Sequence, residues 1–221
     1  MKDYLEDLYS CYENHIKNCK GFCFENYSKG YYLNPANTGY KHGGIILYGQ
    51  EPNGWDKTFD SYAEGIEDII NNRKMTHFCK KIQEVWEQGG LINNIAKFAT
   101  STNGKHPPVS QKDTFWKKMY EEFEFNGEMA TIYQHELEIL KPKKILLLCG
   151  PGRKRAVKLA FQFKSGFIDE YIPHLNKAQC ANRFEHNSIE FMYALHPQAH
   201  MNSETRKEYD EQIEDFLKNK V

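Results

Sequence analysis

Three short segments of the chain place polar side chains directly after apolar runs, where they could carry chemistry. In the segment GQEPN, Glu51 follows the run IILYG and precedes Pro52. Because proline fixes the turn, this position is a rigid mount for a catalytic carboxylate. The alternative for Glu51 is an ordinary solvated carboxylate at a strand exit.

The other two segments carry carboxamides and an imidazole. Asn93 and Asn94 lie in LINNIAKF, where a buried parallel strand would hold apolar side chains. A carboxamide offers both a donor and an acceptor, which suits the edge of a nucleobase. Bonding to neighbouring backbone is the alternative role for these amides. His196 follows IEFMYAL in ALHPQAH, and it is either a functional imidazole or a capping or core histidine.

Neither a metal site nor a phosphate-binding loop is predicted by the residue spacing. His196 and His200 are spaced as HxxxH, but Pro197 between them is incompatible with a zinc-binding helix of the HExxH type. Cys19 and Cys23 form CxxxC with no second close pair, so no zinc site or metal cluster is expected. The segment GPGRKRA is typical of a strand-to-helix turn, with contact to nucleic-acid phosphate as the alternative.

An α/β fold would position these segments. Apolar runs predict buried strands at 45–48, 91–97, 145–149 and 189–195. Helical spacing predicts helices at 3–18, at two places within 66–88, at 127–140, at 153–163 and, with Ser203 as the N-cap, near the end of the sequence. Alternating strands and helices predict a parallel sheet covered on both faces, which binds ligands at the carboxyl ends of its strands. We therefore expect Glu51, Asn94 and His196 to converge on one cleft there.

Composition limits the class of protein. The chain has 221 residues, of which 40% are apolar and 27% charged, as in a soluble globular protein. No apolar run could cross a bilayer, and Met1 leads into a charged segment rather than a signal peptide, so a cytoplasmic protein with free thiols is expected. The formal net charge of −1 argues against strong non-specific binding of nucleic acid but leaves room for a local basic face.

Four motifs occur in an order that resembles the uracil-DNA glycosylase superfamily. They are GQEPN after a strand, INNIAKF, HELEILKPKKILLLCG and LHPQ, and they span about residues 43–200. The resemblance implies a three-layer sandwich with a four-stranded parallel sheet and helices on both faces. It also implies a single domain, with an N-terminal helix and entry segment at 1–42, a motif-bearing core at 43–200 and a C-terminal helix at 201–221.

The resemblance further implies roles for individual residues. Glu51 falls where the family has an Asp or Asn that activates or positions water, and Asn94 matches the Asn that reads the base. His196 matches the His of H-P-S, which faces the uracil O2. The remaining positions expected to bind substrate are Gly49, Gln50, Pro52, Asn53, Pro197, Gln198 and Tyr62, with Phe59 as the alternative to Tyr62 for stacking on the base.

The chain departs from the family pattern at several of these positions. Glu51 replaces Asp or Asn, and a displacement of about 1 Å can cost roughly 100-fold in rate. Asn53 stands where one branch has a Tyr that blocks thymine, and Gln198 replaces Ser. Phe98 occupies one of the positions that hold cluster cysteines in the thermophile-type branch. No iron–sulfur cluster, metal or cofactor is therefore expected.

The resulting prediction is a glycosylase-like hydrolase that removes uracil or another deaminated base from single- or double-stranded DNA. One rival is a catalytically degenerate glycosylase fold that binds nucleic acid or protein. Another is a hydrolase of small nucleosides or nucleotides. A basic rim formed by Lys97, Lys105, Arg153 and His200 would favour DNA, whereas a neutral, closed rim would favour a small ligand.

Overall fold

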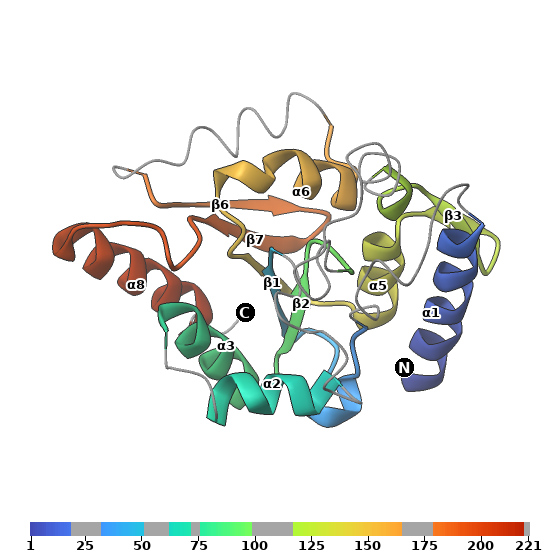
Figure 1. Cartoon of the computed structure of the whole chain (residues 1–221), viewed down its shortest axis with the longest axis horizontal. Helices are drawn as coiled ribbons and strands as arrows, with labels where there is room; N and C mark the ends of the chain where they lie inside the picture. Colours follow the sequence, from blue (N-terminus) through green and yellow to red (C-terminus); the bar gives the residue numbers. More distant parts are fainter. Residues whose placement is uncertain (19–31, 51–61, 72–75, 99–116, 165–178, 219–221) are drawn as a thin grey trace, which may run out of the picture.

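A five-stranded sheet forms the centre of the α/β structure (Figure 1). This computed structural model describes residues 1–18, 32–50, 62–71, 76–98, 117–164 and 179–218. The strands are β1 (Ile45–Gly49), β2 (Leu91–Asn94), β5 (Lys144–Leu147), β6 (Ala181–His186) and β7 (Ile189–Ala194), in the order β2-β1-β5-β7-β6. Every residue of β1, β2 and β5 is buried, which explains their apolar runs. The four predicted strands are present and parallel to one another.

The expectation of a purely parallel, four-stranded sheet is wrong, because β6 pairs antiparallel with β7. The two strands are joined by Asn187 and Ser188, whose φ angles are 50° and 60°. Positive φ at both central residues is the geometry of a type I′ hairpin turn. The strand ANRFEH was missed because it is polar and mostly half-buried, as an edge strand can be.

A second hairpin lies just after the middle of the chain and corrects one predicted helix. Strands β3 (Phe123–Phe125) and β4 (Glu128–Ala130) form a separate two-stranded sheet. The helix expected at 127–140 therefore begins only at Ile132, as α5 (Ile132–Leu140). Thr131 caps it, accepting a hydrogen bond from the Gln134 backbone while the Gln134 side chain accepts one from Thr131.

The other predicted helices are present with small shifts. They are α1 (Lys2–Lys17), α2 (Tyr62–Asn71), α3 (His77–Glu87), α6 (Lys154–Phe161) and α8 (Ser203–Lys218), with short 3₁₀ turns at η2 (Pro35–Asn37) and η3 (Pro151–Arg153). The predicted N-cap of the last helix is wrong by one residue. The Asn202 side chain, and not Ser203, accepts the hydrogen bond from the Thr205 backbone at 2.8 Å.

Side chains of α6 and α8 contact the sheet, whose elements are shown in Figure 1. Toward α6, Phe161 packs on Tyr48 of β1 and on Phe191 of β7, with ring centroids 5.3 and 5.6 Å apart. Toward α8, Lys144 of β5 donates a hydrogen bond to the Phe216 carbonyl at 2.7 Å. Within the described residues, no helix combines the length and the apolar character needed to cross a bilayer. The expected domain boundaries stay a prediction.

Candidate functional site

The ends of β1 and β2 bring Gly49 and Asn94 into register at the carboxyl edge of the sheet. A Cβ atom at Gly49 would lie 2.7 Å from Oδ1 of Asn94 and 3.0 Å from Cζ of Phe78 on α3. Any larger residue at this position would therefore displace the carboxamide or the ring. The glycine of GQEPN is required by close approach and not by an unusual φ angle.

Phe78 also contacts His196, which follows β7. The two ring centroids are 5.2 Å apart, with the planes tilted by 33°. The half-buried Phe78 ring thus lies against the Asn94 and Gly49 end of the sheet and against the imidazole. We call Gly49, Phe78, Asn94 and His196 the strand-end site. Phe78 was not predicted as a site residue, since an aromatic at helical spacing is more often part of a core.

The imidazole of His196 is held in one tautomer by the turn that follows it. The Gln198 backbone N–H donates to Nδ1 of His196 at 3.3 Å. A nitrogen that accepts a hydrogen bond carries no proton, so the neutral ring has its proton on Nε2. Burial lowers the pKa of His196 below its ordinary value of 6.5 and so favours the neutral ring. His196 can therefore act as a neutral Nε2–H donor.

The carboxamide of Asn94 is largely buried but is available to hydrogen-bond a ligand. Its backbone N–H donates to Oδ1 of Asn93 at 2.8 Å, which fixes the main chain at the end of β2. Within the part of the chain that the structure describes, the Asn94 side chain makes no hydrogen bond. Asn94 is 7% exposed and neither amide atom is fully shut off from solvent, so a ligand or water can complete its bonding. This is the arrangement expected of a side chain that reads a polar ligand.

Asn93, in contrast, belongs to a buried polar network. Its Nδ2 donates to Oε2 of Glu136 at 3.0 Å, and its Oδ1 accepts a hydrogen bond from Lys97 Nζ at 2.9 Å. Lys97 and Glu136 form an ion pair in which neither side chain is exposed, and the Tyr9 hydroxyl donates to the same carboxylate at 2.9 Å. Lys97 therefore does not contribute to the basic rim that would favour DNA. Its ammonium points into the core beneath β2.

The exit of β1 is tied to the neighbouring strands. Nε2 of Gln50 donates to the Cys149 carbonyl at 2.8 Å, and the Gln50 carbonyl accepts a hydrogen bond from Ala96 at 3.0 Å. The strand predicted over 91–97 ends earlier, at Asn94. The segment that follows Asn94 bends, and its backbone donates hydrogen bonds to carbonyls at the end of β1. Gln50 thus has a structural bond in addition to its predicted place beside the substrate.

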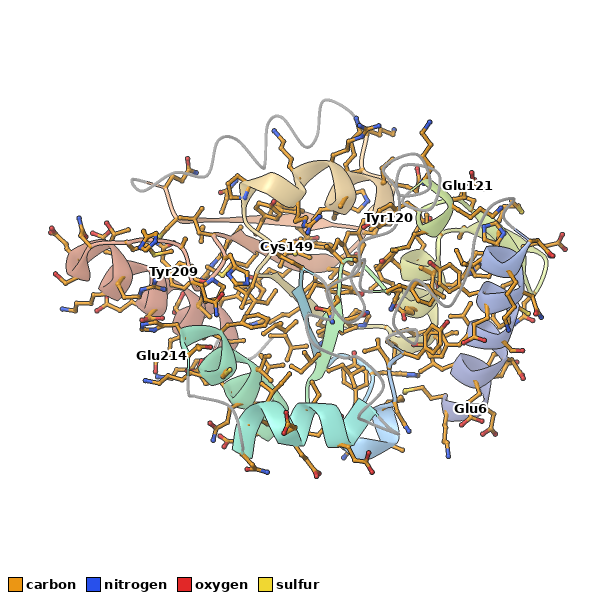
Figure 2. All side chains as sticks on the ribbon, viewed as in Figure 1. Glu6, Tyr120, Glu121, Cys149, Tyr209 and Glu214 are labelled. Carbon is orange, nitrogen blue, oxygen red and sulfur yellow. The ribbon has the colours of Figure 1, made fainter. Side chains whose placement is uncertain are left out.

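Nucleophilic chemistry by a thiol is not supported at this edge. Cys149, labelled in Figure 2, is buried two residues after β5 and donates to the Gly49 carbonyl at 3.3 Å. Burial raises its pKa far above the ordinary thiol value, so the thiolate is disfavoured. Within the described ranges, no group of three His, Cys, Asp or Glu side chains could hold a metal ion.

Several predicted site residues lie outside the described residues. These are Glu51, Pro52, Asn53, Phe59 and, among the rim residues, Lys105. Tyr62 is the first residue of α2, but its side chain is also outside what the structure describes.

The remaining predicted residues lie on the turn after β7 and at the start of α6. Pro197 is buried, Gln198 and His200 are exposed, and Arg153 is half-buried. Arg153 ends the 3₁₀ turn that joins β5 to α6, in agreement with a strand-to-helix turn at GPGRKRA.

Comparison with known proteins adds no relative. No protein-family model matches the chain, and no curated protein sequence matches it significantly.

Proposed function

We propose that this protein is a glycosylase-like hydrolase that cleaves the N-glycosidic bond of uracil or another deaminated base in DNA. The observation that carries the proposal is the joint contact of Phe78 with the Asn94 end of the sheet and with His196. In this proposal, an amide that recognises the base and a neutral N–H donor would act beside one aromatic ring at the carboxyl edge of the sheet. Ligands of open α/β sheets bind at this edge.

The chemistry assigned to each group follows from its protonation and bonding. The Asn94 carboxamide would hydrogen-bond the polar edge of a base that has been flipped out of the stack. The Nε2–H of His196 would stabilise the negative charge that grows on the departing base. A neutral donor suits this role because it stabilises the anion without first transferring a proton to it. Glu51 would orient water and stabilise the cationic sugar, as the resemblance implies.

The fold expected for such an enzyme is part of the proposal. The four parallel strands would form the central layer of a three-layer α/β/α sandwich, with β6 as an added antiparallel edge strand. No metal or cofactor is needed, because water is the nucleophile and the protein supplies every charge.

A catalytically degenerate binding module is the second candidate, and one observation favours it. Lys97 is buried and paired, so the rim that would attract DNA loses one of its expected cations. The formal net charge of −1 points in the same direction. A module of this kind would bind its ligand at the strand-end site without hydrolysing it.

The proposal is tested with single- and double-stranded oligonucleotides that each contain one uracil or another deaminated base. Protein from a host lacking its own uracil glycosylase is incubated with each oligonucleotide, and abasic sites are detected by alkaline cleavage. Cleavage at the deaminated base supports the proposal. An inert wild type together with an active Glu51→Asp variant would identify a degenerate glycosylase. Binding without cleavage by either protein would favour the binding module.

A further inference from the structure

Helix α8 holds the turn that carries His196 by three hydrogen bonds to main-chain carbonyls. The Tyr209 hydroxyl donates to the Leu195 carbonyl at 2.9 Å. The two terminal nitrogens of Arg206 donate to the carbonyls of Pro197 and Ala199, at 2.8 and 2.9 Å. The carbonyls on both sides of His196 and at the end of its turn are thus bonded to one helix.

Arg206 is itself held rigidly. Its guanidinium lies 5.4 Å from the ring centroid of Tyr209, in the geometry of a cation–π contact, and Figure 2 labels Tyr209 on the same helix. Its backbone N–H donates to the Asn202 carbonyl at 3.0 Å, in the first turn of a helix whose N-terminus Asn202 caps. A planar guanidinium fixed in this way can hold two carbonyls at once, which an ammonium does less well.

One of these two carbonyls belongs to the peptide that selects the tautomer of His196. The Pro197 carbonyl and the Gln198 N–H are parts of one planar peptide unit. When Arg206 binds the oxygen, it also fixes the direction of the N–H, which points at Nδ1 of His196. Rotation of this peptide would remove the donor from Nδ1 and leave the ring free to carry its proton on either nitrogen.

We propose that Arg206 is a positioning residue, which selects the Nε2–H tautomer of His196 by fixing the Pro197–Gln198 peptide. The catalytic consequence rests on the proposed function, because only base release needs a donor at Nε2. The structural consequence, which is the choice of tautomer at His196, does not depend on catalysis. The tautomer and the rate of base release can therefore be measured separately.

The experiment compares wild type with Arg206→Met, Arg206→Lys and a matched control, Arg183→Met. Like Arg206, Arg183 donates to a main-chain carbonyl, that of Gln212 at 2.9 Å, and lies over an aromatic ring, that of Phe216. It also pairs with Asp215 at 2.8 Å but does not bond the turn after β7. The ¹⁵N shifts of the His196 ring nitrogens are recorded at about pH 8, where the ring is neutral. Thermal unfolding is recorded for every variant, and base release for every variant of an active wild type.

Wild type and Arg183→Met are expected to show the Nε2–H tautomer alone. Arg206→Met is expected to show a mixture of tautomers and base release about 10- to 100-fold slower at unchanged KM. Arg206→Lys is expected to lie between them. If Arg206→Met does not fold, Arg206→Lys alone decides. A folded Arg206 variant with the wild-type tautomer overturns the proposal. Loss of the tautomer in a protein that releases no base supports the positioning role but rejects the proposed function.

Discussion

Lys97 and Glu136 form an ion pair in which neither side chain is exposed to solvent. Removing one partner leaves an uncompensated buried charge, so Lys97→Met and Glu136→Gln should each lower the free energy of unfolding by about 3–5 kcal/mol. The double variant Lys97→Met/Glu136→Leu should recover only part of this loss, because no buried charge remains but Tyr9 and Asn93 lose their buried partners. Urea denaturation measures all three.

An exposed pair provides the control for this prediction. Lys218 and Glu214 pair at 2.8 Å on the surface of α8. Lys218→Met should change the free energy of unfolding by less than about 1 kcal/mol. Single core variants that are no less stable than the surface control would contradict the burial of the pair.

Gly49→Ala tests the close approach at the strand-end site. The added methyl group would meet Asn94 at 2.7 Å and Phe78 at 3.0 Å, so it should displace two side chains of the proposed ligand site. Base release should fall strongly, with about 1–3 kcal/mol of lost stability from overpacking. Gly152→Ala is the matched control, because a Cβ at Gly152 meets nothing within 4 Å. Equal activity of the two variants would show that Gly49 does not border the site.

Asn93 and Asn94 are adjacent in sequence but should respond differently to alanine. Asn93→Ala removes partners from a buried carboxylate and a buried ammonium, so it should cost about 1–3 kcal/mol of stability. Asn94→Ala removes no side-chain hydrogen bond within the described residues and should change stability by about 1 kcal/mol or less. It should instead weaken ligand binding by about 1–3 kcal/mol, since groups on the base lose their partner. Calorimetry and ligand titration separate the two effects, and the reverse pattern would exchange the assigned roles.

Stability should decrease as the pH falls below about 6.5. The pKa values of His15, His186 and His196 are all lowered from 6.5, in each case first by burial. The unfolded chain then binds more protons than the folded protein between the lowered pKa and 6.5, so this stability is complete above 6.5 and is lost on acidification. Urea denaturation from pH 8 to pH 5 measures the loss. His196→Gln should make the dependence shallower, and an unchanged slope would contradict the lowered pKa.

The sequence predicted the strands and most helices because their signals are local. Apolar runs and helical spacing identify a buried strand or an amphipathic helix without knowledge of its neighbours. Strand β6 was not predicted, because its residues are mostly polar and it is a strand only through its pairing with β7. The start of the helix expected at 127–140 was wrong, because Asn126 and Gly127, both with positive φ, form the turn of a hairpin. The helical spacing of the sequence did not reveal this hairpin.

Site residues that depend on distant partners were harder to predict. Lys97 was considered for a basic rim that would favour DNA, since its sequence does not reveal that Glu136, 39 residues away, pairs with it. Phe78 was missed because its contact with His196 exists only in the folded protein, where α3 packs against β1 and β2. Asn94 and His196 could be selected in advance because they directly follow or end apolar strands, where side chains reach the carboxyl edge of the sheet.

The central claim is that His196 stabilises the departing base as a neutral donor. The most direct test is the single-turnover rate of base release from a uracil-containing oligonucleotide by wild type and His196→Ala, with the affinity for DNA measured in parallel. The claim predicts release by wild type, a loss of about 10²- to 10³-fold in His196→Ala, and nearly equal affinities. Equal rates for the two proteins, or no release of any deaminated base by wild type, would contradict it.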